Sequence, residues 1–282
     1  MKKRFTTSAS FNACAGLLFL IAMPLAAQVA EGDRHYAMRA EGAQGGRAKG
    51  EHIDAAIAAY QRGADLESQW KLLRAYRFKG AYVAANNEEK KKIYGIAKAA
   101  GEKALAAVYK AMPVKANAPE KQVAAAARVI PGAAEVFLWD AVNWGEWALA
   151  YGKLAAAREG AADRIRREAT IAMLIDPRLE GGAPARVLGR LHDQTPRIPF
   201  ITGWASGKEA VRFLNESLRL DPANKITIVF LAEAMVSNDG KTKPQAVKML
   251  RDAIAAPNDP SYLVEQAAAT EDARALLKKL GQ

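Results

Sequence analysis

Cysteine and histidine are scarce in this sequence, and this scarcity restricts the chemistry that the chain supports. Cys14 is the single cysteine, so no disulfide can form within the chain. The three histidines are His35, His52 and His192. None of them stands in the His-x-x-x-His or His-Glu-x-x-His spacing that places zinc ligands on one helix face. We therefore expect no metal ion and no other cofactor.

Motifs of familiar catalytic sites are also missing from the sequence. It contains no Gly-x-Ser-x-Gly segment, and no nucleophile stands beside an obvious base. The segment from Gly203 to Lys208 is similar to a phosphate-binding loop but is one residue short. Glu209 then follows where that motif needs serine or threonine. We predict that the protein is not an enzyme.

The first residues have the layout of a secretory signal peptide. Basic residues at positions 2–4 precede an apolar run over residues 15–22, and two alanines follow at 26–27. The run is too short to span a bilayer, which takes about 20 apolar residues. We predict a cleavable signal peptide over residues 1–27, the alternative being a buried N-terminal helix. Because Cys14 precedes the apolar run instead of following it, we expect an exported protein that is soluble rather than lipidated.

Positive charge exceeds negative charge by +11 at neutral pH. A basic surface can attract anionic lipid, an acidic protein or nucleic acid. Nucleic acid does not fit an exported protein, so we expect no nucleic-acid partner. The two dense basic runs, at residues 90–92 and 164–167, are interpreted as solvated helix faces.

Apolar residues recur at helical spacing along most of the chain. The first such face consists of Ile53, Ala56, Ile57 and Tyr60. Alanine, the best helix former, is abundant. Further helices are predicted over residues 88–110 and on either side of Pro131-Gly132 between residues 120 and 152. Residues 28–50 are polar and rich in glycine, so we predict a flexible leader before a single all-helical domain over residues 51–282.

A repeat is visible in the second half of the chain. The second helix of a tetratricopeptide unit has alanine, a large apolar residue, a small residue and then proline at fixed spacing. Ala210, Leu214, Ser217 and Pro222 match this spacing in full. A second match, without the proline, consists of Ala246, Leu250 and Ala253. Partial copies include Ala172 with Pro177, and Ala56 with Tyr60. We predict an all-α fold, a degenerate tetratricopeptide-like helical-repeat array.

Three tryptophans and an asparagine lie within nine residues of one predicted helix. They are Trp139, Asn143, Trp144 and Trp147. Trp139 and Asn143 share one stripe of the helix, and Trp144 shares another with Trp147. Both stripes cannot be buried in a single direction. Either the helix is central and packed on two sides, or one stripe lines a cavity in which an apolar ligand binds.

Two interruptions follow that helix. Gly181-Gly182 breaks the chain, and Pro184 suits the first turn of a new helix that carries Arg186. Residues 194–204 then contain two prolines and three large apolar residues without helical period, Phe200 and Trp204 among them. A tetratricopeptide turn needs only a few residues, so this insert is predicted to be a functional or interface loop.

The order of these features resembles one family. Residues 141–147 (Ala-Val-Asn-Trp-Gly-Glu-Trp) are followed by Ile-Asp-Pro at 175–177, Gly181-Gly182, Arg-Val-Leu-Gly at 186–189 and the proline-rich insert. This combination resembles the TatT component family of TRAP (tripartite ATP-independent periplasmic) transporter accessory proteins. The likeness runs from about residue 53 to the end of the chain and is strongest over residues 137–222.

The resemblance implies a periplasmic homotrimer that docks a TRAP substrate-binding protein. It also implies an apolar channel that passes a small hydrophobic ligand. Residues that would line this channel are Trp139, Asn143, Trp144, Trp147, Arg186, Phe200 and Trp204. Two features depart from the family: no lipobox is present, and Ala185 stands where relatives tend to have a histidine.

Two alternatives to this function remain open. The first is a general periplasmic scaffold of tetratricopeptide type, which would capture a peptide or helix in a concave groove within an envelope complex. The second is an enzyme such as a cell-wall hydrolase, which would need a polar cleft with a carboxylate of raised pKa. The sequence contains no motif that favours the enzyme.

Overall fold

The structure is a computed structural model that describes residues 25–282, and helices account for most of this range. The α-helices in it are α1 (Leu25–Ala37), α2 (Glu51–Gln61), α3 (Leu66–Phe78), α4 (Asn87–Lys110), α5 (Glu120–Ala127), α6 (Ala133–Tyr151), α7 (Lys153–Arg158), α8 (Ala161–Ile175), α9 (Leu179–Gln194), α10 (Gly207–Leu220), α11 (Lys225–Asn238), α12 (Lys243–Ala255) and α13 (Leu263–Lys279). A π-helical turn, η1 (Lys79–Val83), and two 3-10 turns, η2 (Gly240–Thr242) and η3 (Pro260–Tyr262), complete the set. Over these residues no β-strand forms, which confirms the all-α prediction.

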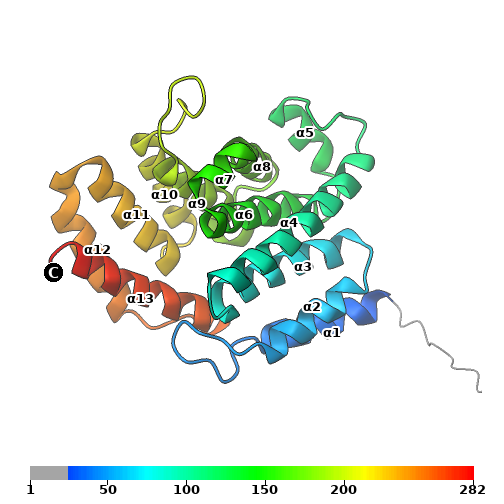
Figure 1. Cartoon of the computed structure of the whole chain (residues 1–282), viewed down its shortest axis with the longest axis horizontal. Helices are drawn as coiled ribbons and strands as arrows, with labels where there is room; N and C mark the ends of the chain where they lie inside the picture. Colours follow the sequence, from blue (N-terminus) through cyan, green and yellow to red (C-terminus); the bar gives the residue numbers. More distant parts are fainter. Residues whose placement is uncertain (1–24) are drawn as a thin grey trace, which may run out of the picture.

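Most consecutive helices pack against each other along the array, whereas α5 packs on α8. Figure 1 shows the chain passing from α1 and α2 through the central helices to α10, α11 and α12, after which α13 begins beside the loop that follows α1 and runs back along α12. The two ends of the described chain are joined there, because the backbone N–H of Gly46 donates to Glu271 of α13 at 2.9 Å. A Cβ on Gly46 would lie 2.6 Å from the backbone of Ala268, so only glycine permits this approach.

The tetratricopeptide spacing predicted in the second half is confirmed by the packing of α10 and α11. Ala210, Leu214 and Ser217 of α10 are fully buried. The helix ends at Leu220, just before Pro222, which cannot continue it. Asn224 then caps α11 through its side chain, which accepts a hydrogen bond from the backbone N–H of Thr227 at 3.0 Å. The α10–α11 pair is therefore specified locally, by small residues on α10 and a stop signal at its end.

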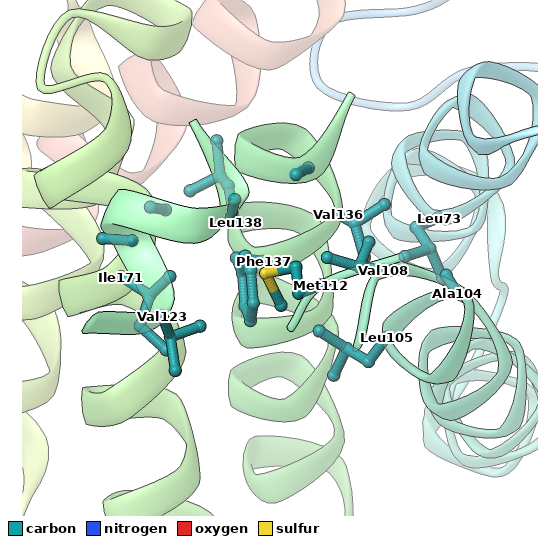
Figure 2. Packing of buried hydrophobic residues seen from close by; sticks show 14 of the residues in the cluster. Leu73, Ala104, Leu105, Val108, Met112, Val123, Val136, Phe137, Leu138 and Ile171 are labelled. Atoms are coloured by element: carbon teal, nitrogen blue, oxygen red, sulfur yellow. The ribbon is translucent and has the colours of Figure 1, made fainter. Parts of the chain in front are cut away.

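The largest buried cluster surrounds α6. Figure 2 shows Phe137 and Leu138 between Val108 of α4 on one side and Ile171 of α8 on the other. The ring of Phe137 also meets the ring of Tyr109 edge to face, with centroids 5.8 Å apart. This helix is apolar around most of its circumference because α3, α4, α8 and α9 all pack on it. The central position of α6 is one of the two alternatives that its tryptophan pattern left open.

Residues 28–50 are ordered, which corrects the prediction of a flexible leader. Most of α1 falls in this range and packs on α2, and Val29 of α1 is buried. The Tyr60 hydroxyl of α2 donates to Asp33 at 2.8 Å. Polar composition and glycine content misled the prediction, since the groups that hold this segment come from distant parts of the chain. The predicted signal peptide, residues 1–27, lies outside the described residues except for its last three positions, where α1 begins.

Candidate functional site

Four arginines and three glutamates from five segments gather where the two ends of the array meet. We call this set the arginine cluster; it consists of Arg39, Arg74, Arg77, Arg186, Glu146, Glu180 and Glu265. Helices α3, α6, α9 and α13 contribute to it, together with the loop after α1. Of its members, only Arg186 was selected from the sequence. The others lie far apart in the chain and form no motif.

Arg39 joins the loop after α1 to α13. Its Nε and Nη2 donate to the same carboxylate oxygen of Glu265, at 3.0 and 2.7 Å, and both side chains are about nine-tenths buried. Nη2 also donates to the backbone carbonyl of Ser261 at 2.6 Å. The guanidinium lies 4.5 Å from the ring centroid of Tyr36. A buried pair with this many contacts fixes the closure of the array.

The guanidinium of Arg77, which belongs to α3, is held in place by a tyrosine and a carboxylate. Its Nη1 donates to the hydroxyl of Tyr82 at 2.6 Å, and its Nε donates to Glu146 at 3.3 Å. Tyr82 lies in the π-helical turn η1, an irregularity that often marks a functional position in a helix. Burial opposes the charge of Arg77, but the nearby Tyr82 and Glu146 raise its pKa above the ordinary value.

Arg74 pairs with a glutamate that the Gly-Gly break places. The Nη1 of Arg74 lies 3.8 Å from Glu180, whose backbone has φ of 47°, an unusual value for a residue with a side chain. Gly181 and Gly182 also have positive φ, and a Cβ on Gly182 would lie 2.9 Å from Leu220. The break therefore lets α9 approach α10 closely and turns Glu180 toward α3. The side chains of this pair stay about one-fifth exposed, so solvent reaches the cluster.

Arg186 has a charge that the rest of the cluster does not neutralise. Within the described residues no carboxylate forms an ion pair with it, and its buried Nη1 has no hydrogen-bond partner. Burial lowers its pKa, and the charge of Arg77 lowers it further. Asp221 and Glu180 favour the charged form from a distance. The guanidinium remains charged at neutral pH, since arginine does not deprotonate in proteins.

Trp139 packs against the apolar core around α6, and Asn143 contacts α3. Asn143 is fully buried, and its Nδ2 donates to the carbonyls of Leu73 in α3 and Trp139 in α6, at 3.0 and 2.8 Å. The Nε1 of Trp139 is buried and has no acceptor within the described residues. Asn143 thus connects α6 to α3, whereas Trp139 keeps an unused donor.

Trp144 and Trp147 form a second aromatic stripe, which is packed. Their rings meet at 5.5 Å, edge to face, and both residues are buried. The ammonium of Lys98 lies 4.2 Å from the Trp144 ring centroid and 4.6 Å from that of Trp147. Arg164, on α8, lies 4.5 Å from the centroid of the Trp144 ring. Through these contacts with the two cations, the aromatic stripe packs α6 against α4 and α8.

A buried carboxylate pair adjoins this stripe. Asp140 on α6 and Glu168 on α8 both contact Arg164, at 3.1 and 2.9 Å. Burial raises the pKa of both carboxyls, and the nearby charge of Asp140 raises that of Glu168 further. Because both are nearly inaccessible to solvent, they lack the polar cleft that a hydrolase needs.

Phe200 and Trp204 occupy the loop between α9 and α10. Trp204 is anchored, since its Nε1 donates to Asp163 at 2.9 Å and Arg166 lies 4.5 Å from its ring centroid. Phe200 is at 107% of its reference exposure and has φ of 62°. The channel-lining role expected of Phe200 stays a prediction. The loop carries it away from the cores of the array.

A hollow of about 280 Å³ lies between α9, α11 and α13. Its lining consists of Arg190, Val229, Phe230, Glu233, Asp272, Ala275, Leu276 and Lys279. Arg190 is one helical turn beyond Arg186 and donates to Glu233 at 2.6 Å. The lining mixes both signs of charge with an aromatic ring, a composition that suits a peptide better than an apolar molecule.

Residues 25–282 contain neither a metal-binding cluster nor a membrane-spanning helix. No group of histidine, cysteine and acidic side chains there is arranged to hold a metal ion. None of the helices in this part of the chain combines the length and apolar character needed to cross a bilayer.

Comparisons with known proteins assign the chain to no family. No family model matches the sequence, and no curated protein matches it. A solved structure described as the TPR2AB-domain:pHSP90-complex of yeast Sti1 is similar over 92% of this chain and 98% of that chain. The two sequences are 14% identical, and the TM-score is 0.32. So loose a likeness adds nothing to the fold described above.

Proposed function

We propose that this protein is a non-catalytic accessory protein that docks a partner through the loop between α9 and α10. In its specific form, the proposal is a periplasmic accessory of a TRAP-type transport system, with the substrate-binding protein as partner and a small ligand passed between them. The resemblance in the segment from residue 137 to 222 motivates the specific form. The exposed tip of the loop is the observation that supports docking.

The tip consists of Ile198, Phe200 and Ile201, all of which are exposed. Exposing three large apolar side chains side by side is unfavourable for a protein with no partner. The left-handed backbone at Phe200 adds a cost of about 1–2 kcal/mol. Folding alone does not account for either feature, whereas a partner that covers the tip would account for both.

Hydrogen bonds hold the tip in one shape. The backbone N–H of Ile198 donates to Oγ1 of Thr202 at 3.0 Å, and the N–H of Thr202 donates to the carbonyl of Ile198 at 2.9 Å. The Thr202 hydroxyl also donates to the carbonyl of Pro196. A tip that is already shaped loses little conformational entropy on docking. Arg197 beside it favours a partner pocket that is apolar with an acidic rim.

The test is capture of a partner from periplasmic extract by the wild type and by the double variant Phe200→Ser, Ile201→Ser. We expect the wild type to retain a substrate-binding protein of a tripartite transporter, identified by mass spectrometry, and the variant to bind it about 10- to 100-fold more weakly. Val129→Ser is the matched control, because Val129 is 83% exposed but lies outside the loop. Equal retention by all three proteins would refute docking through the tip.

A general scaffold is the second candidate, and the hollow between α9, α11 and α13 favours it. Phe230 offers an aromatic surface there, with Arg190 4.3 Å from its ring centroid. A peptide partner would contact this ring and the mixed charges around it. If Phe230→Ala abolishes capture of a protein that the tip variant still binds, the scaffold replaces the transport accessory as the proposed function.

A further inference from the structure

The short helix α7 lies on the surface between two glycines. None of its residues is buried, and it rests on the core through Ala155 and Ala156, which are partly buried. Gly152 and Gly160 at its two ends have φ of 90° and 64°. A Cβ at either glycine would meet open space, so the backbone conformation and not close packing requires them. The chain is therefore shaped to place this helix outward.

The outer face of α7 combines a leucine with two cations. Its exposed residues are Lys153, Leu154, Ala157 and Arg158, and Leu154 is 67% exposed. At 3.6 residues per turn, these four side chains fall within an arc of about 140°. The carboxylate that follows them, Glu159, forms its ion pair with Lys98 of α4, at 2.8 Å. A helix with an apolar residue between cations has the character of one that lies on a membrane surface.

Both ends of α7 are connected to α4. Tyr151, just before the helix, donates its hydroxyl to the carbonyl of Lys91 at 3.5 Å, and the Lys91 ammonium lies 5.8 Å from its ring centroid. At the other end, the ion pair of Lys98 with Glu159 makes the connection. Lys91 and Lys98 are seven residues apart, about 10 Å along one face of α4. The helix α7 therefore lies alongside the first half of α4.

The neighbouring face of α4 has the same character as α7. Lys92 and Ile96 are exposed one helical turn apart, and Ile96 is 53% exposed. They directly follow Lys91 and Gly95, and a Cβ on Gly95 would lie 3.8 Å from the Tyr151 hydroxyl. Over residues 87–98 and 149–159 together, six cations stand against three carboxylates. We call the exposed set the basic face; it consists of Lys92, Ile96, Tyr151, Lys153, Leu154 and Arg158.

The composition of the basic face favours a lipid surface over a protein. Lysine is depleted in protein–protein interfaces. A second copy of this chain that packed on the same face would bring like charges together. An anionic bilayer, in contrast, attracts lysine and arginine and accepts leucine and isoleucine among its headgroups. Tyrosine suits the same boundary, because its ring is apolar and its hydroxyl is polar.

We propose that the basic face binds reversibly to the surface of an anionic phospholipid bilayer. Leu154 and Ile96 enter the headgroup region, and the cations beside them contact lipid phosphates. This inference goes beyond the proposed function, because it involves neither the tip nor the partner that docks there. It also gives a role to part of the basic run at residues 90–92, which the sequence alone presented as a solvated helix face.

The test is flotation of the protein with vesicles, after removal of the predicted signal peptide, whose apolar run would itself bind lipid. The vesicles consist of phosphatidylcholine alone or with about one-third phosphatidylglycerol. We expect binding to the anionic vesicles to be at least about 10-fold tighter, and to be mostly lost in about 0.5 M salt. Absence of binding to the anionic vesicles, or equal binding to both kinds, overturns the proposal.

A pair of charge variants assigns the binding to the basic face. The double variant Lys92→Gln, Lys153→Gln should bind anionic vesicles about 10- to 30-fold more weakly. The double variant Lys121→Gln, Lys248→Gln lowers the net charge equally at exposed positions of α5 and α12 and should change binding less than about 2-fold. Circular dichroism checks that each variant is folded. Equal losses in the two variants would show that net charge alone attracts the protein, and would overturn the assignment.

Apolar variants separate the basic face from the tip. Leu154→Ser should weaken vesicle binding about 3- to 10-fold, whereas Val129→Ser, at an exposed position outside the face, should not. The tip variant Phe200→Ser, Ile201→Ser should bind vesicles as the wild type does. If the tip variant loses vesicle binding and Leu154→Ser keeps it, the loop contacts the membrane and the proposal is wrong. Because partner capture uses the same tip variant, the proposed function and this inference can fail separately.

Discussion

Replacing Glu168 by glutamine is expected to make the protein more stable at neutral pH and less sensitive to pH. Glu168 is buried beside Asp140, and neither Oε2 of Glu168 nor Oδ1 of Asp140 has a hydrogen-bond partner within the described residues, so we infer that the two carboxyls share a proton. Arg164 neutralises one of the two carboxylates. Ionising the second leaves an uncompensated negative charge in the interior, which glutamine avoids while still donating a hydrogen bond to Asp140.

The sign follows from proton binding. The pKa of Glu168 is raised in the folded state, so the folded chain holds a proton that the unfolded chain has released. This contribution to stability is fully present below the ordinary carboxyl pKa of about 4.3. It is lost as the pH rises from there to the raised pKa. The loss is at most about 1.4 kcal/mol per pH unit for one proton.

Urea unfolding of the wild type and of Glu168→Gln between about pH 5 and about pH 8 measures this effect. The difference in unfolding free energy, variant minus wild type, should grow with pH. Glu102→Gln is the matched control, since Glu102 lies 3.9 Å from the same arginine but has a side chain that is 55% exposed. A difference that stays constant or shrinks with pH would refute the shared proton, as would the same pH trend in the control.

Three further predictions concern closure, packing and the strained tip. Arg39→Ala leaves Glu265 buried without its cation and should cost about 3–5 kcal/mol in urea unfolding, whereas Arg62→Ala at the surface should cost under about 1 kcal/mol; equal costs would show that the closure is unimportant. Gly101→Ala should destabilise the chain because its Cβ would lie 1.7 Å from the buried carboxylate of Asp140 on α6. Gly145→Ala, with open space around it, should raise the unfolding free energy by about 0.5–1 kcal/mol. A Gly101→Ala variant that is more stable than the wild type would contradict this packing. Phe200→Gly should relieve the left-handed backbone and raise the thermal midpoint, while partner capture falls; a lower midpoint would show that the loop is not strained.

The repeat could be predicted from the sequence because its determinants are local. Ala210, Leu214 and Ser217 lie on one face of a single helix, and Pro222 follows within the same few residues. These positions specify a close helix contact and a stop without any information from the rest of the chain. The helix over residues 88–110 and the pair around Pro131-Gly132 were predicted on the same basis, and the structure confirms them.

The ordering of residues 28–50 could not be predicted, because it depends on distant contacts. Arg39 and Glu265 are 226 positions apart, and neither belongs to a motif. Before the fold is known, a polar segment with glycines gives no sign of whether a partner for its arginine exists. Its composition is the same in a leader and in a segment that closes an array.

The tryptophans of α6 show which features residue spacing predicts and which it does not. Their pattern left open whether α6 is packed on two sides or lines a cavity with one stripe, and it gave no sign of what covers each stripe. Lys98 of α4 and Arg164 of α8 pack against the ring of Trp144. The sequence does not indicate that these two cations contact an aromatic ring. Trp139, on the other stripe, keeps an unused donor. The arginine cluster was missed for a similar reason, since the topology assembles it from five separate segments.

The measurement that tests the account most directly is the thermal stability of Arg186→Met without any ligand. If Arg186 is retained for binding, its unpaired charge destabilises the empty protein, and methionine of similar length should raise the thermal midpoint. A lower midpoint for Arg186→Met would show that the arginine stabilises the fold, and would contradict its assignment as a binding residue.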